Sequence, residues 1–127
     1  VSNARNLSID PARIAALAQW LLSPMLDERT AAWTALDGLN HFLWTNHANR
    51  HGWSSYLNIP AAELGTVPPP PGAVPARRNT FEGLHPTWIG VGTIDLFHNE
   101  DAAYTRDLKR SGVDITFITV GGSSAWL

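Results

Sequence analysis

Asp95 is the residue whose type and position are best suited to catalysis or ligand binding. It follows shortly after a short run of apolar residues. Trp88–Val91 is uncharged and has the character of a strand buried on both faces of a parallel sheet. In an open α/β sheet, ligands bind and reactive side chains gather at the carboxyl ends of the strands. Asp95 is therefore the candidate functional residue. The alternative is an acid that only caps a helix or closes a loop.

The histidines suggest a second kind of chemistry, which is metal binding. His47 and His51 lie four residues apart, on one face of an expected helix, and His41 is nearby. A metalloprotease helix would also need a glutamate between its two histidines, and none stands there. The intervening Asn46, Asn49 and Arg50 indicate a solvated polar face instead. We therefore expect neither a metal site nor a bound cofactor.

The elements that must position Asp95 form a βαβ unit. Asn99 is expected to begin a helix, and Glu100 and Asp101 then lie where the helix dipole favours negative charge. Tyr104 and Leu108 lie four residues apart and would share the face of that helix that packs on the sheet. Gly112 would end the helix. The alternating residues 113–120 predict the next strand. The fold class is α/β.

The segment Ile89–Asp101 closely resembles the acid-bearing segment of bacterial carboxylesterases of the hormone-sensitive-lipase-like group, which are α/β-hydrolases. It has the glycines Gly90 and Gly92, an aspartate, two apolar residues, a basic residue and an acidic pair, with Asn99 as a mild departure. The resemblance implies a serine carboxylesterase acting on small acyl esters, with Asp95 as the acid of the catalytic triad. It covers Ile9–Val120 and implies one partial α/β-hydrolase domain over residues 1–127, with a mostly parallel sheet of about three strands and flanking helices.

Two other parts of the family's catalytic machinery have no counterpart in this sequence. No Gly-x-Ser-x-Gly elbow and no His-Gly-Gly motif occur, so the nucleophile and the oxyanion donors are missing. Ser124 stands where the family's catalytic histidine is expected, and a hydroxyl is no general base near neutral pH. His98 is too close to Asp95 in sequence, and His85 is expected at the opposite end of the strand. The serines that lack an elbow setting are Ser54, Ser55, Ser123 and Ser124.

Three functions are consistent with this pattern. The first is a truncated, degenerate esterase, a pseudoenzyme with little or no activity alone. The second is one part of a split esterase whose partner supplies the nucleophile. The third is a non-catalytic binding or scaffold domain that uses an apolar sheet face or the polyproline segment Pro68–Pro71.

The first third of the chain supports two conflicting interpretations. Asp10 as N-cap, Pro11 at the first helical position and apolar residues at 14, 17, 18, 21 and 22 predict an amphipathic helix. The resemblance instead implies that Ile9–Ala15 leads into the nucleophile strand and that Gln19–Arg29 forms the following strand and its exit loop. The two pieces are joined here without the elbow between them, and we therefore also consider a strand over about 17–23.

The middle of the chain is predicted to cover the sheet. Residues 30–59 are rich in tryptophan and histidine, and the helical spacing of Leu39, Phe42 and Leu43 suggests a helix that packs its aromatic side chains on the sheet. Gly52–Leu57 resembles a Gly-Trp-x-x-Tyr-Leu piece of the same esterases. Residues 60–78 form a proline-rich connecting loop.

Composition limits the partners. The formal net charge of -2 and the lack of basic clusters argue against nucleic acid, and no apolar stretch has the length of a membrane span. The absence of cysteine fits a cytoplasmic protein. Loss of a central strand and its helix would expose an edge and uncover tryptophans, so we expect marginal stability or self-association through the exposed sheet edge. The tryptophans concerned are Trp20, Trp33, Trp44, Trp53 and Trp88.

Overall fold

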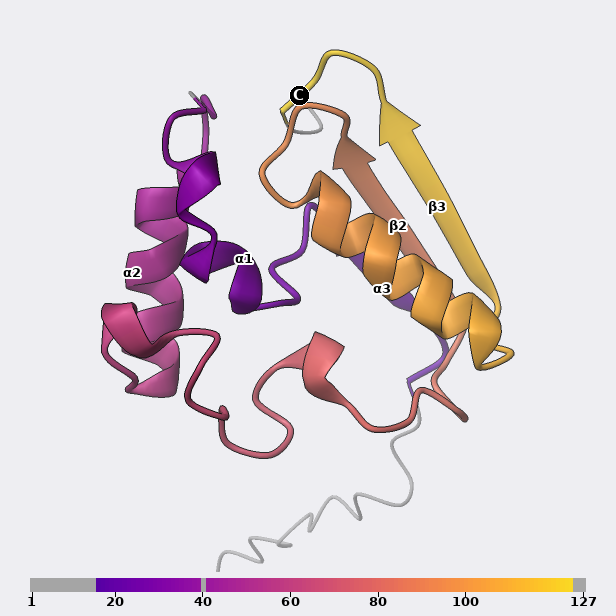
Figure 1. Ribbon diagram of the computed structural model, residues 1–127. Helices are drawn as coiled ribbons and strands as arrows, with labels where there is room; N and C mark the ends of the chain where they lie inside the picture. The colour runs from indigo at the N-terminus through magenta and orange to yellow at the C-terminus, as the bar shows by residue number, and fades with distance from the viewer. Residues whose placement is uncertain (1–15, 40, 125–127) are drawn as a thin grey trace, which may run out of the picture.

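The computed structural model describes residues 16–39 and 41–124 and contains one three-stranded parallel sheet (Figure 1). The strands are β1 (Gln19–Leu22), β2 (Thr87–Gly92) and β3 (Ile115–Val120), and β2 lies between the other two. The central strand β2 is buried at every position except Trp88, which is half-buried, in line with its short uncharged sequence. The predicted strands at 88–91 and 113–120 are thus confirmed, and so is an α/β fold with a parallel sheet of three strands.

β1 resolves the conflict over the start of the chain in favour of a strand. Trp20 pairs with Trp88 and Leu22 with Gly90, in parallel register. The prediction of a helix is therefore wrong for residues 19–22. Their apolar residues have helical spacing, but hydrogen bonding to β2 makes this segment a strand. The proposed cap Asp10 and the segment Ile9–Ala15 lie outside the described residues, as does Trp126.

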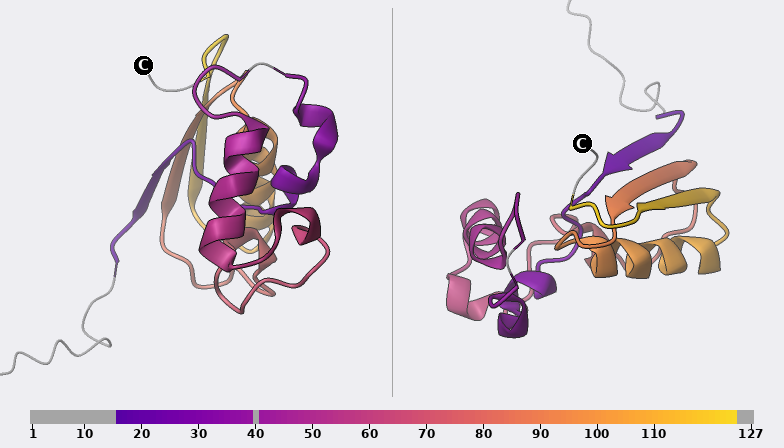
Figure 2. Two further views of the ribbon diagram at one scale, coloured as in Figure 1. Left: turned by 90° about the vertical axis from the view of Figure 1, so that its left-hand side faces the viewer. Right: turned by 90° about the horizontal axis from the view of Figure 1, so that it is seen from above.

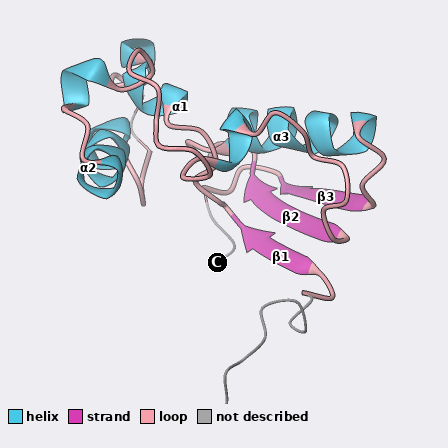
Figure 3. Cartoon of the chain, turned by 90° about the horizontal axis from the view of Figure 1, so that it is seen from below, coloured by secondary structure: helices cyan, strands magenta, loops and turns pink. Residues whose placement is uncertain are grey.

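Helix α3 (His98–Arg110) covers only one face of the sheet, as the view from above shows (Figure 2, right). The core between helix and sheet contains Tyr104 and Leu108 from α3 and Ile89 from β2. Leu21 and Phe117 pack against the same core. The opposite face carries no helix among the described residues (Figure 3). On that face the rings of Trp20 and Trp88 meet edge to face, with their centroids 5.5 Å apart.

The middle of the chain forms a second, separate helical group rather than a cover for the sheet. It consists of α1 (Arg29–Ala32), η2 (Thr34–Leu36), α2 (Asn46–Leu57) and η3 (Ala61–Glu63). Trp53 and Leu57 of α2 pack with Ala31 of α1 and Leu64 in a core of their own. The prediction that a helix in this region packs its aromatic side chains on the sheet is therefore wrong. Trp53 of α2 is buried in the separate core of this helical group instead.

Local details in this group also differ from the prediction. α2 begins at Asn46, where the Thr45 hydroxyl accepts a hydrogen bond from Ala48 N at 3.2 Å, and Phe42 before it is 83 % exposed instead of helical and packed. Asn46 and Asn49 are buried, so the prediction that they form a solvated polar face is wrong as well. Asn46 Nδ2 donates to the Asp37 carboxylate and to the main-chain carbonyls of Ala31 and Trp33, which supplies the partners that a buried amide needs.

The tryptophans are exposed to very different degrees. Trp20 is 78 % exposed, and Trp33 and Trp44 are also exposed, as expected for a shortened sheet. Trp88 is half-buried. Trp53 is only 4 % exposed, so the expectation is wrong for this residue, because the second core buries it.

The proline-rich segment connects the two groups. It contains η4 (Pro75–Arg77), and Leu64 and Val74 along it are buried in the second core, while Pro68, Pro70 and Pro71 are exposed. Among the described residues, no helix is both long and apolar enough to cross a membrane.

Candidate functional site

Asp95 lies in the turn between β2 and α3, at the carboxyl end of the central strand. Its main-chain N donates to Gly92 O at 3.1 Å, and its Oδ1 accepts from Phe97 N at 2.9 Å. His98 N donates to Asp95 O at 3.2 Å and begins α3. The carboxylate is half-buried, and it stabilises the turn while remaining at the surface of the fold. The helix therefore begins at His98, one residue before the expected start at Asn99.

The loop that follows β3 lies directly against this turn. Thr93 N donates to Val120 O at 2.9 Å, Ile94 N donates to Ser123 O at 3.2 Å, and Gly122 N donates to Thr93 Oγ1 at 2.9 Å. Ser124, which holds the position expected for a catalytic histidine, is the next residue in that loop. The fold thus brings together the loop after β2, which carries Asp95 (the acid loop), and the loop after β3, where the catalytic base was expected. The loop after β3 carries the hydroxyl of Ser124 in place of that base.

A cavity of about 440 Å³ opens between Asp95 and the second helical group. One wall is made by the segment before α2, with Leu36, Leu39 and Phe42, and the other wall is the acid loop. The described residues that line this cavity include His41 and His98 but neither a serine nor a cysteine. The cavity therefore joins a carboxylate to apolar walls, and the only hydroxyl in the described part of its lining is that of Thr93, which accepts from Gly122 N.

Of the other residues considered for chemistry, His41 and His98 line the cavity beside Asp95, whereas His85, His47 and His51 do not. His85 precedes β2 and so lies at the amino end of that strand, opposite Asp95. The His98 ring faces Phe117 at 6.4 Å, and its Nδ1 is 3.4 Å from Asn99 Oδ1. His47 and His51 are in α2, and within residues 16–39 and 41–124 no group of three potential ligands is arranged to hold a metal ion.

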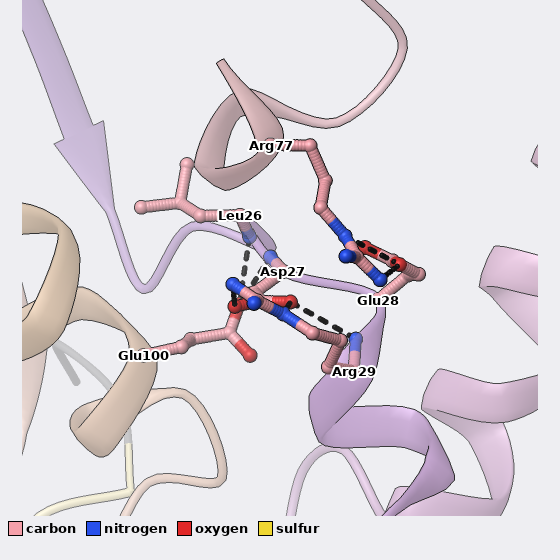
Figure 4. A network of polar contacts seen from close by, with 6 residues as sticks. All are labelled: Leu26, Asp27, Glu28, Arg29, Arg77 and Glu100. Atoms are coloured by element: carbon pink, nitrogen blue, oxygen red, sulfur yellow. Dashed lines mark hydrogen bonds and ion pairs between the residues drawn. The ribbon is translucent and has the colours of Figure 1, made fainter. Parts of the chain in front are cut away.

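Sequence reasoning missed a set of buried acids behind the site. Glu100 Oε1 accepts from Leu26 N at 2.7 Å and from Asp27 N at 3.2 Å, which ties α3 to the segment after β1 (Figure 4). Glu28 is fully buried and pairs with Arg77, whose Nε lies 2.9 Å from Glu28 Oε1. Only the acidic pair after Asp95 hinted at such a cluster in the sequence.

Burial changes the ionisation of two of these acids. It raises the pKa of Glu100 from its ordinary value of 4.5 to about 7, although main-chain N–H groups oppose this shift. The pKa of Asp101 rises to about 9, because its carboxyl group is buried and the charges of Glu100 and Asp95 lie nearby. The sequence placed both side chains in the first helical turn to complement the dipole. They are in that turn, but Asp101 is neutral at pH 7.

Comparison with known proteins places this geometry in a family. Residues 3–124 match the family described as alpha/beta hydrolase fold, and the chain belongs to that family. Esterase LipW from Mycobacterium marinum is similar, with 30 % identity and a TM-score of 0.66, over 82 % of this chain and 31 % of that one. A search of curated proteins found no match.

Two further solved structures extend the comparison. A thermostable esterase from Pseudomonas putida ECU1011 is 26 % identical with a TM-score of 0.64, over 85 % of this chain and 33 % of that one. A structure described as bacterial heroin esterase has 21 % identity and a TM-score of 0.61, and the match covers 89 % of this chain and 37 % of that one. The chain spans about a third of the length of these proteins and is an esterase-related α/β-hydrolase.

Proposed function

We propose that this chain carries the acid-bearing part of a carboxylesterase-type site, with Asp95 as the triad acid, and that the 127 residues alone have little or no ester hydrolase activity. The observation that carries this proposal is the position of Asp95 at the carboxyl end of β2, beside the loop after β3. In a serine hydrolase the acid orients an imidazole that accepts the proton of the nucleophile. Small acyl esters are the substrate class that the related esterases suggest.

The chemistry explains why the acid alone is not enough. Acyl transfer needs a nucleophile, a general base and donors for the oxyanion, and these contribute as a unit. No Gly-x-Ser-x-Gly is present in the 127 residues, and Ser124 replaces the base. In a triad the carboxylate acts only through the imidazole that it orients. Without the histidine, the nucleophile and the oxyanion donors, Asp95 therefore has no catalytic role in this chain alone.

Hydrolysis of p-nitrophenyl butyrate by the purified chain tests this proposal, with Asp95→Asn as the matched variant. We expect the two proteins to show the same rate as buffer alone. Turnover by the unmodified chain that Asp95→Asn abolishes would contradict the proposal, because a complete site would then be present.

A split esterase is the second candidate, and the open cavity beside Asp95 favours it. The cavity of about 440 Å³ leaves room for a nucleophile from another polypeptide. Affinity-tagged chain would be incubated in cell extract and then treated with a fluorophosphonate probe. A co-purifying protein that is labelled with the unmodified chain, and less with Asp95→Asn, is the expected result. Equal labelling, or none, would contradict a split enzyme.

The proposal also includes a cytoplasmic location and self-association through the exposed edge of the sheet. Fractionation of cells that express the protein tests the location, and recovery in the membrane or secreted fraction would contradict it.

A further inference from the structure

The carboxylate of Asp95 has one oxygen that is not used within the described part of the chain. Oδ1 accepts from Phe97 N at 2.9 Å, and Oδ2 has no hydrogen bond to any residue of 16–39 or 41–124. Among the same residues, no lysine, arginine or histidine nitrogen forms an ion pair with Asp95. This half-buried carboxylate can therefore accept a charge-assisted hydrogen bond from a ligand.

The two histidines that line the cavity of about 440 Å³ do not supply a cation to this acid. The His98 ring faces Phe117, with the ring centroids 6.4 Å apart. His41 Nδ1 is buried and has no hydrogen-bond partner among the described residues. Ser124, at the position expected for the imidazole of a triad, carries a neutral hydroxyl. Asp95 therefore lacks the imidazolium that the acid of a complete triad stabilises.

The wall across the cavity from the acid loop is apolar. It is formed by Leu36, Leu39 and Phe42, and the last two of these side chains are exposed. No lysine or arginine is found in the described lining. The volume of about 440 Å³ lies within the range of roughly 300–1,000 Å³ that small-molecule sites have. A fitting ligand places an apolar body on one wall and a hydrogen-bond donor on the other.

The charges around Asp95 favour a cation over an anion in this cavity. An anion would be attracted by the main-chain donors at the start of α3. Two of these donors are already occupied, because Phe97 N donates to Asp95 Oδ1 and His98 N donates to Asp95 O. Burial raises the pKa of Asp101, and the charges of Glu100 and Asp95 add to that rise, so this end of the helix carries a negative field.

We propose that the cavity beside Asp95 binds a small organic ammonium ion whose apolar body packs on Leu39 and Phe42. The ammonium group donates to Asp95 Oδ2 and takes the role of the imidazolium of a complete triad. The inference rests on the proposed function in one respect, which is that no imidazole is paired with the acid. The two can fail separately, because binding is measured without an ester and hydrolysis is measured without an amine.

NMR titration of the isotope-labelled chain with benzylammonium ions tests the proposal. We expect the amide signals of both walls to shift, those of residues 93–97 and those of Leu39 and Phe42. For so small a ligand we expect a Kd on the order of 1 mM. Benzoate and benzyl alcohol carry the same ring without the positive charge, and each should bind at least about tenfold more weakly. Equal binding of benzoate, or shifts that miss either wall, would overturn the proposal.

Asp95→Asn is the variant that removes the charge, and its amide oxygen still accepts from Phe97 N. We expect this variant to bind benzylammonium more weakly by about tenfold or more. Asp107→Asn is the matched control, since it removes the same charge from a half-exposed position of α3 that does not line the cavity. Its Kd should equal that of the unmodified chain. An equal loss in both variants would overturn the proposal, because the overall charge of the protein would then explain it.

The apolar wall is tested by Phe42→Ala. This side chain is 83 % exposed, so its removal leaves both cores intact while taking away part of the surface that the ligand covers. We expect benzylammonium to bind about fivefold more weakly. Leu43→Ala is the control, because Leu43 is the exposed neighbour that does not line the cavity, and its Kd should not change. Equal Kd values for the two variants would place the ligand elsewhere and overturn the proposal.

Discussion

The carbonyl oxygen of Ser123 lies 1.8 Å from the position that a Cβ atom would occupy on Gly92. No side chain can be accommodated there, because real Cβ atoms do not approach a main-chain oxygen so closely. The same carbonyl accepts the hydrogen bond of Ile94 N at 3.2 Å. This close approach holds the loop after β3 against the acid loop after β2, and it explains why glycine ends β2.

Gly92→Ala should therefore destabilise the fold and displace the loop after β3. The added methyl group must push a backbone carbonyl away, and forced overpacking of this kind costs about 1–3 kcal/mol in the free energy of unfolding. Gly121→Ala is the control, since a Cβ at that position meets nothing within 4 Å. Urea denaturation of both variants measures the difference, and equal midpoints would show that the loop is not held in this way.

The structural core of this site could be predicted from sequence because its pattern is local. The apolar run before Asp95, the pair Tyr104 and Leu108, and the alternating strand that follows all depend on neighbouring residues, and each predicted element formed with its ends shifted by a residue or two. The resemblance to esterases added the expectation that Ser124 lies in the loop beside the acid.

Other features could not be predicted because distant contacts decide them. The segment Gln19–Leu22 has the apolar spacing of a helix, and only pairing with β2, far along the chain, makes it a strand. Asn46 has the polarity of a surface residue, but the carbonyls of Ala31 and Trp33 and the carboxylate of Asp37 supply its partners inside the protein. Glu100 is likewise held by the segment after β1, through Leu26 N, and a local pattern does not reveal that contact.

Stability should fall as pH rises because of Asp101. Its pKa rises from an ordinary 3.8 to about 9 in the folded protein, so the folded state keeps a proton that the unfolded state releases. The free energy of unfolding therefore decreases between about pH 4 and pH 9, by at most about 1.4 kcal/mol per pH unit for one such group. Asp101→Asn should flatten this decline, whereas Asp107→Asn, at a half-exposed position of the same helix, should not. Thermal unfolding at a series of pH values measures both; an unchanged slope in Asp101→Asn would contradict the burial of a neutral acid.

Glu100 is expected to act as an acceptor for main-chain groups of the segment after β1. Glu100→Ala leaves Leu26 N without its partner, and an unsatisfied buried donor costs about 1–3 kcal/mol. Glu100→Gln keeps a carbonyl oxygen in the same place and removes the titration near pH 7, so it should be less destabilising than alanine. Chemical denaturation at pH 8 compares the two. Equal losses would mean that the side chain fills space but does not hold the backbone.

The ion pair between Glu28 and Arg77 joins the segment after β1 to the proline-rich connection. Glu28 is fully buried, so Arg77→Ala leaves an uncompensated charge inside the protein, at a cost of about 3–5 kcal/mol. Arg29→Ala removes a surface pair with Asp27 and should cost about 0–1 kcal/mol. Differential scanning calorimetry would show the contrast as a large drop in Tm for Arg77→Ala only. Similar Tm values for the two variants would contradict it.

The most direct test asks whether Asp95 stands where it can orient an imidazole in the loop after β3. Ser124→His introduces that imidazole, and its pKa can be followed by NMR titration. We predict a pKa that is higher than the value of the same histidine in the Asp95→Asn background, because a nearby carboxylate stabilises the imidazolium. Equal pKa values in the two backgrounds would contradict the assignment of Asp95 as the acid of a hydrolase site.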